Sequence, residues 1–297
     1  MVVGTRDLPV SLSPPMIGRT VLVTGASGGI GLATALGLSS LGAHVVITGR
    51  RRDRLVAAAR TIHAATGGSA QFFAADLSSQ SEVRGLAADV LDQLPRLDVL
   101  VNNVGGYWDT RHTTEEGLER TFALNHLAPF LLTNLLLERL RLGVSSRVVT
   151  VASNAHTLGR IDFDDLQGSR NYAGARAYNQ SKLANVLFTY ELARRLRGTS
   201  VTANALHPGV VNTTFGAEDP SAVQRLLVPI FRPLMKNPTR GAATSIQVAS
   251  APALSHVSGR FFTRSGAKRS SARSYDTDVG ARLWQVSAHL TGPSKRA

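Results

Sequence analysis

A tyrosine and a lysine stand four positions apart in the run AYNQSKLANV, residues 177–186. In a helix, side chains at this spacing lie one turn apart on the same face, so Tyr178 and Lys182 would be neighbours. A cation beside a phenol favours the phenolate, and Lys182 would therefore lower the pKa of Tyr178 toward the working pH. Such a phenol can donate and accept a proton in catalysis. The alternative is a tyrosine on a buried face beside a solvated lysine.

Seven short β-rich runs alternate with longer helical patterns along the chain. They are TVLVT (20–24), HVVIT (44–48), AQFFA (70–74), DVLVN (98–102), RVVTVA (147–152), VTANAL (201–206) and RFF (260–262). Strands this apolar, without regular alternation of polar residues, are buried on both faces, as in parallel sheets covered by helices. The sequence therefore predicts an α/β fold, a single doubly wound Rossmann-type domain with a parallel sheet of about seven strands.

No repeat or low-complexity linker divides the 297 residues, so one domain is expected over residues 17–292. Residues 1–16 predict a flexible arm, because they lack the apolar core of a signal peptide. Residues 212–240 contain four prolines around LLVPIF and are interpreted as a flap over the substrate. No apolar run reaches the roughly 18 residues of a membrane span. The absence of cysteine suits a reducing compartment, so we expect a cytoplasmic protein that does not contact a membrane.

The formal net charge of +13 raises the hypothesis of nucleic-acid binding. Only four of the 33 basic residues are lysines, and the arginines are scattered through every predicted helix instead of forming one stripe. General arginine usage therefore explains the charge, and no nucleic-acid partner is expected. His126, His156 and His207 show no metal-ligand spacing, so no metal site is expected and each is interpreted as a packed or hydrogen-bonded histidine.

A glycine cluster, TGASGGIG at residues 24–31, directly follows the first predicted strand and opens a helical run. Glycines there allow a tight turn and the close approach of a pyrophosphate, which the N-terminal amides of the helix then hold. Two glycine spacings of nucleotide-binding folds are both met. One uses Gly25, Gly29 and Gly31, and the other uses Gly25, Gly28 and Gly31.

The residues after the second strand indicate which dinucleotide binds. An acid there holds the ribose hydroxyls of NAD(H), whereas an arginine accepts the 2′-phosphate of NADP(H). The chain has TGRRRDRL, and Arg50 with Arg51 predict NADP(H). NAD(H) is the alternative if these arginines are solvated residues before an Asp53 cap. Asp76 and Leu77, after the third strand, are placed to contact the adenine, although an aspartate there is as often a plain helix cap.

Four motifs in this order give the chain a resemblance to the short-chain dehydrogenase/reductase family over nearly its whole length. They are TGASGGIG, NNVG (102–105), the serine of VASNAH and YNQSK, and FALNH and HPGVVNT (207–213) also match. The asparagine-rich fourth strand and the proline–glycine pair after the sixth favour the first glycine spacing over that of the nucleotide-sugar epimerases. Val104 and Ala152 depart from the family's usual alanine and serine, and we expect altered packing without lost chemistry.

The resemblance implies an NADP(H)-dependent oxidoreductase that transfers hydride between the nicotinamide and the alcohol or carbonyl group of a small apolar substrate. The implied catalytic residues are Asn125, Ser153, Tyr178 and Lys182. Tyr178 would exchange the proton, Ser153 would hydrogen-bond the reacting oxygen, Lys182 would also bind the ribose, and Asn125 would hold a water. The implied cofactor-binding residues are Gly25, Ser27, Gly28, Gly29, Ile30, Gly31, Arg50, Arg51, Asp76, Leu77, Asn103, Val104, Gly105, Tyr178, Lys182, Pro208, Gly209, Val211 and Thr213.

Three runs resemble the retinol dehydrogenase group of the family: FLLTNLLLERL, SKLANVLFTYELARRL and RLWQVSAHLTG. The interval of 25 residues between Ser153 and Tyr178 does so too. The membrane anchor at the start of many retinol dehydrogenases has no counterpart, which argues against a membrane-borne retinoid substrate. The alternative function is a catalytically silent regulator or scaffold that binds NADP(H). Tyr107 and Trp108 are candidates for the pocket wall, and the run LAPFLLTNLLL is either core or a homo-oligomer interface.

Overall fold

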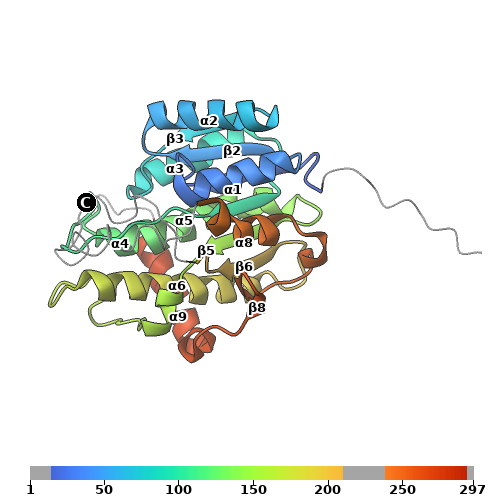
Figure 1. Cartoon of the computed structure of the whole chain (residues 1–297). Coiled ribbons are helices and arrows are strands. Elements are labelled where there is room, and N and C mark those ends of the chain that lie inside the picture. Colours follow the sequence, from blue (N-terminus) through green and yellow to red (C-terminus); the bar gives the residue numbers. More distant parts are fainter. Residues whose placement is uncertain (1–14, 210–237, 293–297) are drawn as a thin grey trace, which may run out of the picture.

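The central feature of the fold is a twisted sheet with helices on both faces (Figure 1). The computed structural model describes residues 15–209 and 238–292, and within these residues the sheet has eight strands in the order β3-β2-β1-β4-β5-β6-β7-β8. The strands are β1 (Thr20–Thr24), β2 (His44–Gly49), β3 (Ala70–Ala74), β4 (Val99–Asn102), β5 (Arg147–Val151), β6 (Thr202–Leu206), β7 (Phe261–Thr263) and β8 (Gly266–Lys268). The longer helices are α1 (Gly29–Ser40), α2 (Arg52–Thr66), α3 (Gln80–Gln93), α5 (Ala128–Arg141), α6 (Gly174–Arg195), α8 (Pro238–Ser250) and α9 (Thr277–Leu290).

All seven predicted strands are present, each within one residue of its predicted bounds at either end. They pair in parallel, which confirms the doubly wound arrangement. The eighth strand, β8, was not predicted, and it pairs antiparallel with β7. Its sequence, GAK, has no apolar pattern, so only the tight connection after β7 brings it to the edge of the sheet.

Alternate residues of each strand face opposite helical layers. Leu22 and Leu100 pack against α3, α5 and α6, whereas Val21 and Val23 pack against α1, α2 and α8. All four side chains are fully buried, and a buried aliphatic side chain of this size contributes about 1.5–3 kcal/mol. The Leu-rich run of α5 lies in the first of these layers, so its leucines belong largely to the core.

The folded part of the chain includes Met16, which the sequence analysis placed in the arm. Its side chain is 3% exposed and packs in the same cluster as α1 and α2. Its backbone N–H donates to the carbonyl of Leu41 at 3.0 Å, just beyond the end of α1. Met16 therefore anchors the start of β1 beneath the first helix.

The strand order reverses direction at β1. The chain passes outward from β1 to β2 and β3, and then returns to place β4 on the other side of β1. In open α/β sheets, ligands bind at such a switch point, in the crevice beyond the carboxyl ends of the strands. The loops after β1 and β4 are therefore the expected place for the functional site.

Candidate active site

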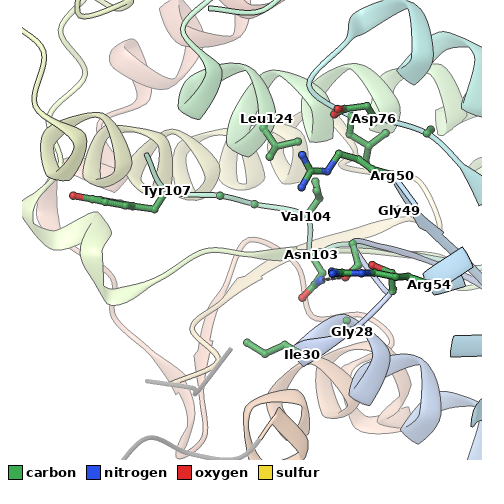
Figure 2. A pocket seen from close by; sticks show the side chains of 18 of the residues that line it. Gly28, Ile30, Gly49, Arg50, Arg54, Asp76, Asn103, Val104, Tyr107 and Leu124 are labelled. Carbon is green, nitrogen blue, oxygen red and sulfur yellow. Dashed lines mark hydrogen bonds between the residues drawn. The ribbon is translucent and has the colours of Figure 1, made fainter. Parts of the chain in front are cut away.

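A cavity of about 520 Å³ lies at this edge of the sheet (Figure 2). Its walls come from the ends of four neighbouring strands and from the start of the helical region near residue 124. They comprise Gly25, Ser27, Gly28, Gly29, Ile30 and Gly31 after β1, Gly49, Arg50 and Arg54 at and after the end of β2, Ala75, Asp76 and Leu77 after β3, Asn103, Val104, Gly105, Gly106, Tyr107 and Trp108 after β4, and Leu124. Most of the predicted cofactor-binding residues thus line a single cavity, and so do the two aromatic residues proposed for its wall.

The glycine turn between β1 and α1 decides between the two glycine spacings. Gly25 and Gly29 have φ angles of 65° and 56°, a region that side chains other than glycine rarely adopt. A Cβ on Gly31 would lie 2.3 Å from the Gly25 carbonyl oxygen. Gly28 has an extended backbone, and a Cβ there would meet no heavy atom of the described residues within 4 Å. The structure therefore requires glycine at the first set of positions and tolerates a side chain at Gly28.

Asn103 holds this turn against the end of β4. Its side-chain amide donates to the Thr24 carbonyl at 2.8 Å. The backbone N–H groups of Asn103 and Val104 both donate to the Thr24 hydroxyl, at 2.9 and 3.0 Å. The neighbouring strand ends are thereby fixed to each other, so Asn103 shapes the cradle in addition to lining it.

The N-terminus of α1 opens directly into this cradle. The helix has twelve residues, and its first turn contains no acidic side chain. Its free N–H groups and the positive end of its dipole favour an anion. A turn where added Cβ atoms would collide, facing a helix N-terminus, fits the pyrophosphate of a dinucleotide.

Two guanidinium groups lie at the β2 side of the cavity. Arg50 and Arg54 both line it, and Figure 2 shows both side chains extending into it. Arg51 is directed elsewhere, because it forms a bidentate pair with Asp53, with Nε–Oδ1 at 3.1 Å and Nη2–Oδ2 at 2.5 Å. The wall position predicted for Arg51 is therefore taken by Arg54, which the sequence analysis did not single out. No pattern in the sequence indicated Arg54, because Arg50 lies before α2, which starts at Arg52, and helical spacing does not relate the two residues.

Asp76 combines the two interpretations that its position allowed. It lines the cavity, and its Oδ1 also accepts hydrogen bonds from the Ser78 backbone N–H at 2.9 Å and the Ser78 hydroxyl at 2.7 Å. Its side chain therefore fixes the turn that precedes α3 and also forms part of the cavity wall. Leu77 is almost fully buried, at 4% exposure.

Tyr178 and Lys182 lie on neighbouring turns near the start of α6, as predicted. Burial raises the pKa of Tyr178 to about 12, and a hydrogen bond from the Ser153 hydroxyl acts in the opposite direction. Burial lowers the pKa of Lys182 to about 8. The Lys182 ammonium lies 5.4 Å from the centre of the Tyr178 ring and donates to the Val151 carbonyl at 3.4 Å. The pKa of the phenol is therefore raised and not lowered toward the working pH as expected, because burial outweighs the hydrogen bond from Ser153.

The catalytic candidates adjoin the cavity at its β4 end. A Cβ on Gly105, which lines the cavity, would lie 3.2 Å from Asn125 Oδ1 and 3.4 Å from Lys182 Nζ. Both side chains therefore pack closely against this glycine of the cavity wall. The ring of Tyr107, which lines the cavity, meets the Tyr178 ring edge-to-face with centres 5.8 Å apart. The structure thus brings Ser153, Tyr178, Lys182 and Asn125 together beside the cavity.

Asn125 connects the β4 loop to α6. It lies in η1 (Ala123–Leu127), a π-helical turn of a kind often found at functional sites. Its Oδ1 accepts from the Gly106 N–H at 2.7 Å, and its Nδ2 donates to the Gly106 carbonyl and to the Ser181 hydroxyl, both at 3.0 Å. Ser181 in turn donates to the Tyr178 carbonyl at 2.7 Å. Ser181 was missed from the sequence, although it directly precedes Lys182 in YNQSK.

Hydrogen bonds hold the loop that carries Ser153 in place. Ser153 caps η2 (Asn154–Leu158), and its Oγ accepts from the Ala155 N–H at 3.2 Å. The Asn154 N–H donates to His207 Nδ1 at 3.2 Å. A Cβ on Gly159 would lie 2.4 Å from the Asn179 carbonyl oxygen, so the end of the loop packs directly on α6. The prediction of packed or hydrogen-bonded histidines is confirmed, since His126 Nε2 also lies 2.8 Å from the Ser287 hydroxyl.

The segment after β6 is only partly described. Pro208 and Gly209 follow β6 at the cavity edge of the sheet, but neither is among the described residues that line the cavity. Val211 and Thr213 lie outside the described residues. So does the proposed flap, residues 212–240, as far as residue 237. Residues 238–240 form the first turn of α8.

The described part of the chain has neither a cluster of metal ligands nor a helix that could span a membrane. Over residues 15–209 and 238–292, no group of three or more His, Cys, Asp or Glu side chains is arranged to hold a metal ion. Over the same ranges, every helix is too short or too polar to cross a membrane.

Comparison with known proteins gives the same assignment as the motifs. A family model described as short chain dehydrogenase matches residues 19–224. The chain belongs to the short chain dehydrogenase family. This membership confirms the predicted class of enzyme, an NAD(P)-dependent oxidoreductase that acts on CH–OH groups.

This short chain dehydrogenase is similar to human retinol dehydrogenase 13, with 42% identity over 93% of the chain and 85% of the relative. It is 41% identical to human retinol dehydrogenase 14 over 93% of the chain and 87% of the relative. Among solved structures, an uncharacterised protein from Mycobacterium paratuberculosis matches with a TM-score of 0.77 and 36% identity, covering 94% of this chain and 95% of the other. The NADP complex of RhlG from Pseudomonas aeruginosa matches with a TM-score of 0.67 and 31% identity, covering 85% and 96%.

Proposed function

We propose that this short chain dehydrogenase uses NADP(H) to interconvert the carbonyl and alcohol groups of a small apolar substrate. One observation carries the proposal: a single cavity has two guanidinium groups, from Arg50 and Arg54, on one side and the Ser153–Tyr178–Lys182 group adjoining its β4 end. The presence of NADP complexes among the solved relatives supports the choice of cofactor.

The described residues divide the work of holding NADP(H). The glycine turn and the N-terminus of α1 would hold the pyrophosphate, and Arg50 with Arg54 would hold the 2′-phosphate. Asp76 and Leu77 are placed for the adenosine part, and Lys182 for the ribose beside the nicotinamide. When bound, the nicotinamide supplies or accepts the hydride.

Tyr178 and Ser153 act on the oxygen of the substrate. A phenol with a pKa of about 12 is protonated at neutral pH, so Tyr178 is ready to donate its proton to a carbonyl oxygen. The Ser153 hydroxyl lies within hydrogen-bonding distance of that phenol and would donate to the same oxygen as negative charge develops there. Lys182, with a pKa of about 8, is mostly cationic at neutral pH and stabilises the phenolate that is left.

The cavity wall beside Tyr178 indicates an apolar substrate. Tyr107 and Trp108 line the cavity after β4, and Tyr107 contacts the Tyr178 ring directly. Figure 2 shows the Tyr107 ring extending away from the arginine side of the cavity. An aromatic wall favours a hydrocarbon group next to the reacting carbon. The similarity to retinol dehydrogenases 13 and 14 supports an apolar alcohol or aldehyde of this kind.

A panel of aldehydes and ketones, with NADPH consumption followed by absorbance, tests the proposal. Apolar and aromatic aldehydes should be reduced, and Ser153→Ala should reduce them far more slowly while still binding NADPH. A wild-type protein that binds NADPH tightly but oxidises it with no carbonyl compound would contradict the proposal. That result would favour a cofactor-binding regulator of the same fold.

A further inference from the structure

His156 lies three residues after Ser153 and is 1% exposed. Its Nδ1 is 2.6 Å from the carbonyl oxygen of Ser153, which can only accept, so Nδ1 carries a proton. Its Nε2 is 3.1 Å from the backbone nitrogen of Ser271, which can only donate, so Nε2 is unprotonated. The two contacts therefore select one neutral tautomer of the imidazole.

Ser271 belongs to residues 270–275, which we call the brace segment and which end in η5 (Ala272–Tyr275). The brace segment is held to α6, the helix of Tyr178, by a 2.7 Å hydrogen bond between the hydroxyls of Ser270 and Tyr190. It contacts the Ser153 loop at a second point, because Arg273 Nη1 donates to the Gly159 carbonyl at 3.1 Å. The brace segment thus links α6 to two points of the loop that carries Ser153, His156 and Gly159.

We propose that His156 is a positioning residue. Its two hydrogen bonds connect the brace segment to the Ser153 carbonyl and so keep the Ser153 hydroxyl against Tyr178. The inference rests on the proposed function, in which that hydroxyl binds the substrate oxygen. Ser153 is the last residue before η2, and its carbonyl is the group through which His156 fixes the backbone on which Oγ stands. A displacement of about 1 Å at a reacting group can lower a rate by about 100-fold.

A role in packing alone is the competing explanation, since the His156 ring also lies 4.8 Å from the ring of Phe261. The two roles differ in what they predict. Packing requires only an aromatic ring at this position, whereas positioning requires the two hydrogen bonds. Ser271 separates the roles further, because its contribution is a backbone N–H and does not involve its side chain.

Four variants test the inference by carbonyl reduction with NADPH, using the aldehyde or ketone that the wild type reduces fastest. His156→Phe keeps a ring against Phe261 and removes both hydrogen bonds, and His156→Asn keeps a donor for the Ser153 carbonyl. Ser271→Pro removes the N–H, and the φ and ψ of Ser271, −62° and 151°, suit proline. Ser271→Ala is the matched control, because the Ser271 hydroxyl has no hydrogen-bond partner among the described residues.

The expected result is a loss in kcat of about 10- to 100-fold for His156→Phe and for Ser271→Pro, with the Kd for NADPH unchanged. His156→Asn should recover part of the loss, and Ser271→Ala should match the wild type. Assays are run well below the Tm of each variant, so that a loss of folded protein is not read as a loss of rate. If His156→Phe does not fold, the Ser271→Pro and Ser271→Ala pair decides alone.

The outcomes separate this inference from the function on which it rests. If Ser153→Ala impairs reduction but His156→Phe or Ser271→Pro keeps the wild-type kcat, the inference is overturned and the proposed function stands. If Ser153→Ala reduces carbonyls as fast as the wild type, the proposed role of Ser153 fails and the inference fails with it. Equal losses in Ser271→Pro and Ser271→Ala would also overturn the inference, since the backbone N–H would then not be the cause.

Discussion

Replacing Arg54 with alanine should weaken the binding of NADPH and leave the binding of NADH almost unchanged. Arg54 lines the cavity beside Arg50, whereas Arg51 is paired with Asp53 and does not line it. The 2′-phosphate is the group that distinguishes the two cofactors, so an arginine that contacts it affects only one of them. Arg51→Ala is therefore the matched control, with the same change in net charge at the residue directly before α2.

The size of the effect follows from the exposure of these arginines. Arg50 and Arg54 are both exposed, so water screens the contact and the value for buried charge pairs does not apply. Two unit charges 4 Å apart in water attract by about 1 kcal/mol, and a phosphate monoester carries a charge of about −1.5 to −2. Each arginine should then contribute about 1 to 2 kcal/mol, or roughly 5- to 30-fold in the Kd for NADPH.

Calorimetric titration provides the measurement without requiring turnover. Adenosine 2′,5′-bisphosphate and 5′-AMP differ only in the 2′-phosphate, so the Kd for 5′-AMP divided by the Kd for the bisphosphate isolates this contact. The ratio should fall in Arg50→Ala and in Arg54→Ala, stay constant in Arg51→Ala, and fall in the wild type as salt is added. If Arg54→Ala leaves the ratio unchanged, or Arg51→Ala shifts it as far, the assignment of Arg54 is wrong. A wild type that prefers NADH would refute the choice of NADP(H) itself.

Four further predictions concern the site and its surroundings. Tyr178→Phe should abolish carbonyl reduction and leave the Kd for NADPH nearly unchanged, because the proton is lost but the cofactor contacts remain; normal turnover by this variant would disprove the mechanism. The kcat/KM for reduction should fall above about pH 8, since it reports the free enzyme, in which Lys182 loses its charge near that pH; a flat profile would show that this charge is not needed. Gly31→Ala should lower the Tm while Gly28→Ala keeps the wild-type Tm, as thermal unfolding will show, because an added Cβ collides with protein atoms at Gly31 and meets no heavy atom of the described residues within 4 Å at Gly28. Burial lowers the pKa of His126 to about 3, so the unfolding free energy should fall as pH drops from about 6.5 toward 3, by at most about 1.4 kcal/mol per unit, and His126→Asn should remove that part of the slope in denaturant titrations.

The sheet could be predicted from the sequence because each strand is apolar on both faces. The strands from TVLVT to RFF could be predicted without knowing any distant contact, because a strand buried between two helical layers is marked by its own apolar composition. The strand β8 had no such signal. The choice between Gly28 and Gly29 is a different case: the neighbouring motifs favoured the spacing with Gly29, and the φ of 56° gives the physical reason, because it requires glycine at that position.

The catalytic candidates were predictable from motifs, but the groups that hold them were not. Ser181, His156 and the backbone of Ser271 act through contacts between segments that are distant in the sequence. Which arginine faces the cavity was also undetermined, because Asp53 attracts Arg51 and the start of α2 turns Arg54 inward. Residue types at the spacing of a motif identify the chemistry, and the contacts between loops determine which neighbours support it.

The corrected pKa of Tyr178 changes what Lys182 contributes. Burial disfavours the charged form of both groups, so the resting site holds a protonated phenol and a single cation. When Tyr178 gives its proton to the substrate, the site comes to hold a phenolate beside an ammonium, and a buried ion pair is favoured over an isolated buried charge. In the proposed mechanism Lys182 would therefore assist by stabilising the phenolate, which holds the pKa of the phenol below the value that burial alone would give it.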